Sequence, residues 1–63
     1  MKSAELITPD GFKITMVSGD RGQLIIFRAF EGRVIPFDDS RYTLSDEGEA
    51  MIAREIGKFC AGA

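Results

Sequence analysis

TLSDEGEAMIAREIGKFCAG, residues 43–62, is the stretch that decides the fold, because its pattern predicts the one helix of the chain. Ser45 is a favourable N-cap, since a serine hydroxyl accepts a hydrogen bond from a backbone N–H one turn further on. An apolar stripe follows at spacings of four and three residues and consists of Ile52, Ile56 and Phe59. We therefore expect a helix from about residue 45 to about residue 60 whose stripe packs on the rest of the chain.

This helix depends on that packing. Gly48 and Gly57 lie inside it, and each costs roughly 1 kcal/mol of helix stability relative to alanine. Gly48 is on the apolar side, where the missing β-carbon is expected to let a strand backbone come close. Isolated helices of this length are marginal in water. The sequence thus predicts a helix that is stable only as a cover for another layer.

Four strands are predicted ahead of the helix, at about residues 4–8, 12–17, 23–30 and 33–37. Turn signals separate them at Pro9-Asp10-Gly11, at residues 18–22 and at Glu31-Gly32. Turns this short make consecutive strands antiparallel neighbours. We expect one small domain over residues 1–63, with an α+β fold: a four-stranded antiparallel β-meander (ββββα) and the C-terminal helix packed on one face.

The third predicted strand is apolar on both sides. Alternation places Leu24, Ile26 and Phe30 on one face together with Arg28, and Ile25, Phe27 and Ala29 on the other. A strand that needs cover on both faces is expected in the interior of the sheet. The fourth strand is expected at an edge, because Pro36 lacks a backbone N–H for the ladder. The sequence leaves open which face the helix covers.

One helix covers only one face of such a sheet, and the other face is left with apolar side chains. Ile25 and Phe27 are candidates for that face, or else Leu24, Ile26 and Phe30. Further candidates are Val17, Ile7, Ile35 and Phe37. Fully burying one such side chain stabilises a protein by about 1.5–3 kcal/mol. Two interpretations remain. In the first, the sheet curls or the N-terminal segment folds across it, and both sets of apolar side chains join a single monomeric core. In the second, the open face or an edge strand is an interface with a second copy or with another protein.

The composition argues against catalysis and against metal or phosphate binding. The 63 residues contain no histidine and a single cysteine, Cys60, so a serine or cysteine nucleophile lacks the usual base. Asp38 and Asp39 are adjacent but are not followed by calcium-loop spacing, and the glycines do not form a phosphate loop. We expect a protein without enzymatic activity, cofactor or metal. The lone cysteine and the missing signal peptide favour a soluble, cytoplasmic protein with no membrane contact.

We interpret the chain as a protein-binding module whose partner is a host protein complex or a second copy. Its size and lack of a catalytic set are typical of phage or mobile-element inhibitors of host defence, including anti-CRISPR proteins, by character rather than by motif. The predicted contact residues are Ile25, Phe27, Arg28 and Arg33 on the sheet, with Asp38, Asp39 and Glu47 as a charged rim.

Two alternatives remain open. The first is a small homodimeric assembly or accessory subunit. The second is a nucleic-acid-binding regulator, in which arginines and aromatic residues of the sheet stack on single-stranded nucleic acid. The net charge of −2 argues against the second alternative.

Overall fold

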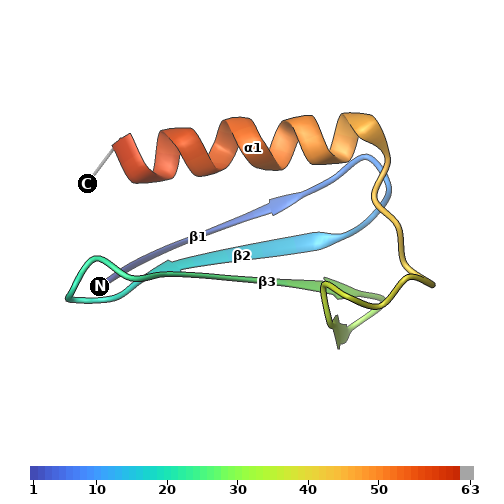
Figure 1. Ribbon diagram of the computed structural model, residues 1–63, viewed down its shortest axis with the longest axis horizontal. Coiled ribbons are helices and arrows are strands. Elements are labelled where there is room, and N and C mark those ends of the chain that lie inside the picture. Colours follow the sequence, from blue (N-terminus) through green and yellow to red (C-terminus); the bar gives the residue numbers. More distant parts are fainter. Residues whose placement is uncertain (62–63) are drawn as a thin grey trace.

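Residues 1–61 are described by the computed structural model, which shows four strands followed by one helix (Figure 1). The elements are β1 (Lys2–Ile7), β2 (Lys13–Ser18), β3 (Leu24–Phe30), β4 (Arg33–Ile35) and α1 (Asp46–Ala61). The expected α+β fold is confirmed. Residues 62 and 63, which end the predicted domain and the quoted helical stretch, lie outside the described residues.

The strands form one antiparallel sheet in the order β1-β2-β3-β4. β3 is therefore interior and β4 is an edge strand, as predicted. β4 ends at Ile35, earlier than the sequence predicts, because Pro36 has no N–H to donate to β3. β1 begins at Lys2, earlier than predicted, since Lys2 pairs with Ser18 at the end of β2.

Tight turns set the register of the sheet. Thr8 and Phe12 close the first turn by the bond from the Thr8 N–H to the Phe12 carbonyl, 2.9 Å, and Gly11 adopts a φ of 94° there. The β3–β4 turn has two central residues, Glu31 and Gly32, with φ of 51° and 80°. Positive φ at both central residues is the requirement of a type I′ hairpin.

α1 lies across one face of the sheet (Figure 1), and its start is tied to the first hairpin. Ser45 is confirmed as the N-cap, because its Oγ accepts from the Gly48 N–H at 3.1 Å. The Asp10 carboxylate accepts from the Ser45 N–H at 2.7 Å and from the Ser45 hydroxyl at 2.6 Å. A turn residue thus holds the helix at its N-terminus.

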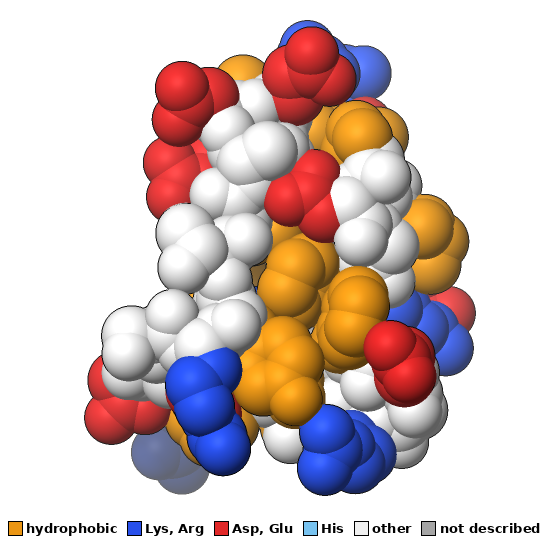
Figure 2. All heavy atoms as spheres, turned by 90° about the vertical axis from the view of Figure 1, so that its right-hand side faces the viewer, with side chains coloured by type: hydrophobic (Ala, Val, Ile, Leu, Met, Phe, Trp, Pro, Cys, Tyr) orange, Lys and Arg blue, Asp and Glu red, His pale blue; other side chains and the backbone are white. Residues whose placement is uncertain are grey.

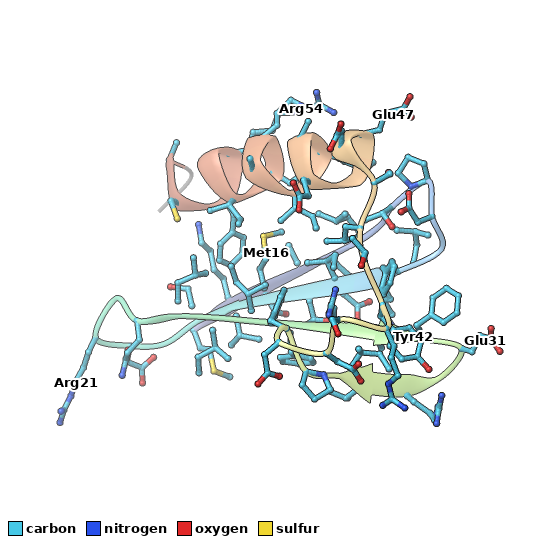
Figure 3. All side chains as sticks on the ribbon, turned by 45° about the vertical axis from the view of Figure 1, so that its right-hand side comes forward. Met16, Arg21, Glu31, Tyr42, Glu47 and Arg54 are labelled. Atoms are coloured by element: carbon cyan, nitrogen blue, oxygen red, sulfur yellow. The ribbon has the colours of Figure 1, made fainter. Side chains whose placement is uncertain are left out.

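The core lies between α1 and the sheet, where Figure 3 places Met16. Its buried hydrophobic residues are Phe12, Ile14, Met16 and Ile35. Met16 lies directly opposite Ile26 in the β2–β3 register. Because directly opposed side chains point to the same face of a sheet, Ile26 also lies on the covered face. The helix therefore covers the Leu24, Ile26 and Phe30 side of β3.

α1 closes this core incompletely. Gly48 is its one buried residue, while Ile52, Ile56 and Phe59 are half-buried. A β-carbon at Gly48 would contact side chains of Leu44, Ser45 and Asp10. The expected approach of a strand backbone at Gly48 is therefore replaced by contacts with the helix start and the first turn. α1 is neither long nor apolar enough to cross a membrane.

Candidate protein-binding surface

The sheet face opposite α1 is uncovered in the described chain, and we call it the open face. By register it consists of Ser3, Glu5, Ile7, Lys13, Thr15, Val17, Ile25, Phe27, Ala29 and Val34. Four of its hydrophobic side chains are exposed: Ile7 by 59%, Ile25 by 55%, Phe27 by 39% and Val34 by 68%. The N-terminal segment does not fold across them, because residues 2–7 form the edge strand β1, and their exposure shows that no other part of the described chain buries them.

Strand pairing brings these side chains together. Val17 lies opposite Ile25, and Thr15 lies opposite Phe27. Ala29 lies opposite Val34 on the other side of β3. The open face therefore has an apolar ridge along β3, with β-branched neighbours on both sides.

Val34 is the member of this surface that the sequence analysis missed. The signal for it was present in the two-residue turn at Glu31-Gly32, which pairs Phe30 with Arg33. One step further along each strand, Val34 must then face the same way as Ala29. Ile35, which was a candidate for the open face, points the other way and is 5% exposed.

One ion pair crosses the open face. Lys13 Nζ lies 3.2 Å from Glu5 Oε2, and both side chains are about half exposed. Glu5 and Lys13 are the charged members of the open face as defined above. The surface is therefore electrically balanced and mostly apolar.

Arg28, which the sequence analysis grouped with Ile25 and Phe27, does not belong to the open face. Arg28 lies opposite Ile14, on the covered face, and is 4% exposed. Its Nη2 donates to the carbonyls of Pro36, at 2.8 Å, and Asp39, at 3.4 Å. The guanidinium also lies over the ring of Phe37, 5.2 Å from its centroid. Arg28 thus anchors the segment that leads from β4 to α1.

The grouping of Arg28 with Ile25 and Phe27 conflicts with the alternation that the sequence already shows. Residues 25 and 27 face one way, so residue 28 must face the other. Its Nε is buried without a hydrogen-bond partner. Two carbonyl acceptors and the neighbouring aromatic rings of Phe12 and Phe37 offset the burial of its charge.

The remaining predicted contact residues do not form one rim around the open face. Arg33 pairs with Phe30 in register, on the covered side, and donates from Nη2 to the Tyr42 hydroxyl at 2.9 Å. Glu47 lies on the outer side of α1, away from the sheet (Figure 3). Asp38 is exposed in the connection to α1. The structure thus brings together Ile25 and Phe27 and separates Arg28, Arg33 and Glu47 from them.

Asp39 is engaged within its own loop. Arg41 donates to its carboxylate from Nε at 3.0 Å and from Nη2 at 2.9 Å. These side-chain hydrogen bonds, reinforced by the Arg41 backbone N–H, lower the pKa of Asp39 from 3.8 to about 2. The Asp39 carboxylate is therefore ionised at neutral pH and hydrogen-bonded to Arg41.

A second surface lies at the end of the molecule near the start of α1. Figure 2 shows hydrophobic side chains in the middle of this face, most of the acidic groups above them, and basic groups together with further acidic groups below. Phe12, Phe30 and Tyr42 form tilted aromatic pairs, with ring centroids 5.0 Å apart for Phe12–Phe30 and 5.8 Å for Phe30–Tyr42. These contacts explain the aromatic residues as packing between the sheet and the segment before α1.

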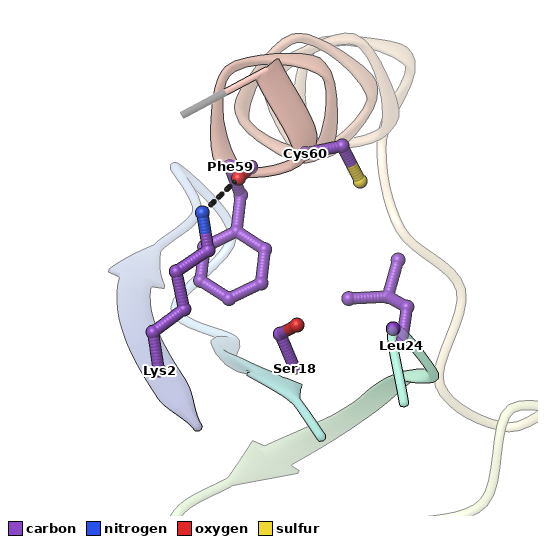
Figure 4. Close-up of a pocket in the computed structure, with 6 residues that line it drawn as sticks. Lys2, Ser18, Leu24, Phe59 and Cys60 are labelled. Atoms are coloured by element: carbon purple, nitrogen blue, oxygen red, sulfur yellow. Dashed lines mark hydrogen bonds between the residues drawn. The ribbon is translucent and has the colours of Figure 1, made fainter. Parts of the chain in front are cut away.

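A small cavity of about 130 Å³ opens where the end of α1 meets the sheet (Figure 4). Lys2 donates from Nζ to the Phe59 carbonyl at 2.5 Å and lies 4.5 Å from the centroid of the Phe59 ring. Cys60, Leu24 and Ser18 also line the cavity. Lys2 thus caps the last turn of α1, where the helix dipole favours a cation near the free carbonyls.

Within residues 1–61, no group of three or more histidine, cysteine, aspartate or glutamate side chains is placed to hold a metal ion. Of the seven large hydrophobic side chains that are exposed in the described fold, four lie on the open face. Comparisons with protein-family models, with curated proteins and with solved structures give no match.

Proposed function

We propose that this chain is a protein-binding module without enzymatic activity, and that it binds through the open face of its sheet. The observation that supports the proposal is the exposure of Ile7, Ile25, Phe27 and Val34 on one side of a four-stranded sheet. Exposed apolar patches rimmed by polar residues are typical of interaction sites. Burial of this patch by a partner would release its hydration water and stabilise the complex.

The basic residues on and beside the open face give the nucleic-acid alternative no support. Arg28, which follows the exposed Phe27 in the sequence, is buried and donates to backbone carbonyls. The open face has a lysine, Lys13, but Glu5 neutralises it at 3.2 Å. A phosphate backbone is bound by unpaired basic groups, which favours a protein as the partner.

The partner that we propose is a host defence complex, which the chain would block as inhibitors from phages and mobile elements do. Such an inhibitor needs a binding surface but no catalytic residues. The open face supplies such a surface, and the exposed start of α1 with Asp46 and Glu47 supplies a second, acidic one.

The experiment is affinity capture with matched variants. The wild-type chain, Phe27→Lys and Ala53→Lys are immobilised and exposed to lysate of cells that carry the gene, and each captured protein is then purified and titrated by calorimetry. Ala53 lies on the exposed side of α1, so Ala53→Lys adds the same charge away from the open face. We expect Phe27→Lys to weaken binding by about tenfold or more, since central aromatic residues dominate such interfaces.

The outcome that contradicts the proposal is equally specific. A purified partner that binds wild type and Phe27→Lys with equal affinity, but loses affinity for Ala53→Lys, would place the binding surface on α1. Measurable turnover of any substrate by the purified chain would contradict the absence of enzymatic activity.

A further inference from the structure

We infer that a cavity beside Arg28 binds a singly charged organic carboxylate. The cavity has a volume of about 210 Å³ and is lined by Arg28 of β3, by residues of the segment that joins β4 to α1, and by Glu49 in the first turn of α1. Arg28 lies on the covered side of β3, so this site is separate from the open face and the inference goes beyond the proposed function. Three observations carry it: a buried guanidinium nitrogen without a partner, the chemistry of the cavity wall, and the charge balance there.

The first observation concerns the Arg28 guanidinium, which is 4% exposed. Its Nη2 donates to two backbone carbonyls, but its Nε is buried without a hydrogen-bond partner in the part of the chain that the structure describes. Among residues 1–61, no carboxylate forms an ion pair with Arg28. Buried charges are normally paired, and a buried donor without an acceptor is costly. An anionic oxygen at Nε would satisfy both the donor and the charge.

The second observation concerns the wall of the cavity. Tyr42 and Ser40 line it with hydroxyl-bearing side chains. The Tyr42 hydroxyl oxygen accepts from Arg33 Nη2 at 2.9 Å, which leaves its own proton to donate. Phe37 and Leu44 add apolar surface to the same wall. A carboxylate with a short hydrocarbon chain matches this wall, because its oxygens accept from guanidinium and hydroxyl groups while the chain packs on apolar side chains.

The third observation is charge. Asp39 also lines the cavity, but Arg41 donates to its carboxylate at 3.0 and 2.9 Å and balances its charge. Glu49 is the other acidic residue of the wall, and its side chain is exposed. A ligand with a single negative charge pairs with Arg28 and meets limited repulsion from Glu49. A phosphate monoester or a dicarboxylate brings a second negative charge near Glu49 and is therefore disfavoured.

Binding requires a local movement, because Nε itself is buried. The covering segment, residues 36–45, contains neither helix nor strand. Arg28 holds it through the carbonyls of Pro36 and Asp39, at 2.8 and 3.4 Å. The carboxylate should therefore displace part of this segment, and the backbone amides of residues 36–45 should respond to the ligand together with Arg28.

The test is a titration followed by ¹H–¹⁵N NMR of the Arg28 Nε–H group. Sodium butyrate is the probe, butyramide is the neutral control of similar size, and sodium chloride keeps the ionic strength constant. Butyrate should shift the Nε–H resonance and the amides of residues 36–45 to saturation. Butyramide should bind more weakly, because a charged acceptor forms the stronger hydrogen bond, and inorganic phosphate should also bind more weakly than butyrate.

Two further probes distinguish the sources of the carboxylate. N-acetylleucine carries the carboxyl end of a protein chain, and N-acetylleucinamide is its neutral control. Tighter binding of N-acetylleucine than of butyrate assigns the site to a chain terminus, and the reverse order assigns it to a free carboxylate.

The matched variants are Glu49→Gln and Glu47→Gln, which remove the same charge from two positions of α1. Glu49→Gln should strengthen butyrate binding by about two- to fivefold. Glu47 lies on the outer side of α1 (Figure 3), so Glu47→Gln should have a smaller effect. Arg28→Gln should abolish binding, and the glutamate pair keeps the test valid if this variant does not fold.

Three results would overturn the inference. The first is an Arg28 Nε–H resonance that does not move with butyrate, which would leave water as the acceptor. The second is an equal response to butyrate and butyramide, which would exclude recognition of the charge. The third is an equal effect of Glu49→Gln and Glu47→Gln, which would place the bound carboxylate outside the cavity.

Discussion

The two faces of the sheet have similar side chains and opposite surroundings. On the covered face, Ile14 is 0% exposed and Met16 is 2% exposed. On the open face, Ile25 is 55% exposed, although it also belongs to an interior strand. Local hydrophobicity therefore does not decide which residues form the core. The connection to α1 decides it, because the helix lies on only one side.

The largest expected effect compares the same substitution on both faces. Ile14→Ala removes a fully buried side chain and should lower the free energy of unfolding by about 2–5 kcal/mol. Ile25→Ala should change it by less than about 1 kcal/mol in dilute solution, because its side chain already contacts water. Urea denaturation followed by circular dichroism measures both.

If Ile14→Ala is too unstable to purify, Ile14→Val is the graded substitute, with an expected loss of about 0.5–1.5 kcal/mol. Equal losses for Ile14→Ala and Ile25→Ala in dilute solution would contradict the assignment of the two faces.

Asp10 helps to hold α1 on the covered face, because it joins the first hairpin to the start of the helix, and its substitution should have the next largest effect. Asp10→Ala removes both acceptors of Ser45, at 2.7 and 2.6 Å, and should lower the free energy of unfolding by about 1–2 kcal/mol. Hydrogen exchange should rise in the first turn of α1 more than in β2. As a control, Asp20→Ala removes an exposed carboxylate that pairs with the N-terminus and should have a smaller effect. Equal exchange in Asp10→Ala and wild type would show that the helix start is held by other contacts.

Gly57→Ala should stabilise α1 without altering either face of the sheet. Gly57 is exposed, and a β-carbon there meets no atom within 4 Å, so alanine should add about 0.5–1 kcal/mol through helix propensity. Gly32→Ala is the matched control, because Gly32 has a φ of 80° in the β3–β4 turn and alanine is strained there. Thermal unfolding should move in opposite directions for these two variants.

The smallest effect lies outside both faces. Arg41→Gln removes the two side-chain bonds to Asp39 and should raise the pKa of Asp39 from about 2 toward 3.8. Because the folded-state pKa lies below the ordinary value, the stabilisation from this pair is complete above about pH 4 and is lost as pH falls toward 2. Carboxyl NMR titration measures the shift, and Arg54→Gln should leave the pKa of Asp39 unchanged.

Part of the candidate site followed from the sequence. Alternation along residues 24–30 separates Ile25 and Phe27 from Leu24 and Ile26, and the same alternation excludes Arg28 from their face. The prediction of Arg28 as a contact residue beside them therefore conflicts with this alternation, although charged residues in general prefer the surface. Its burial depends on carbonyls supplied by Pro36 and Asp39, which no local pattern indicates.

The sequence by itself determined the elements and their order. Turn residues such as Pro9, Gly11 and Gly32 separate the strands, and the stripe that starts at Ile52 specifies the helix, because these signals act over a few residues of chain. Only the tertiary structure decided which face became the core. Both faces of β3 are apolar, so that choice depends on contacts between distant residues: Arg28 holding the connection to α1, and Asp10 holding Ser45 at the start of the helix. These contacts place α1 on one side and leave the open face uncovered.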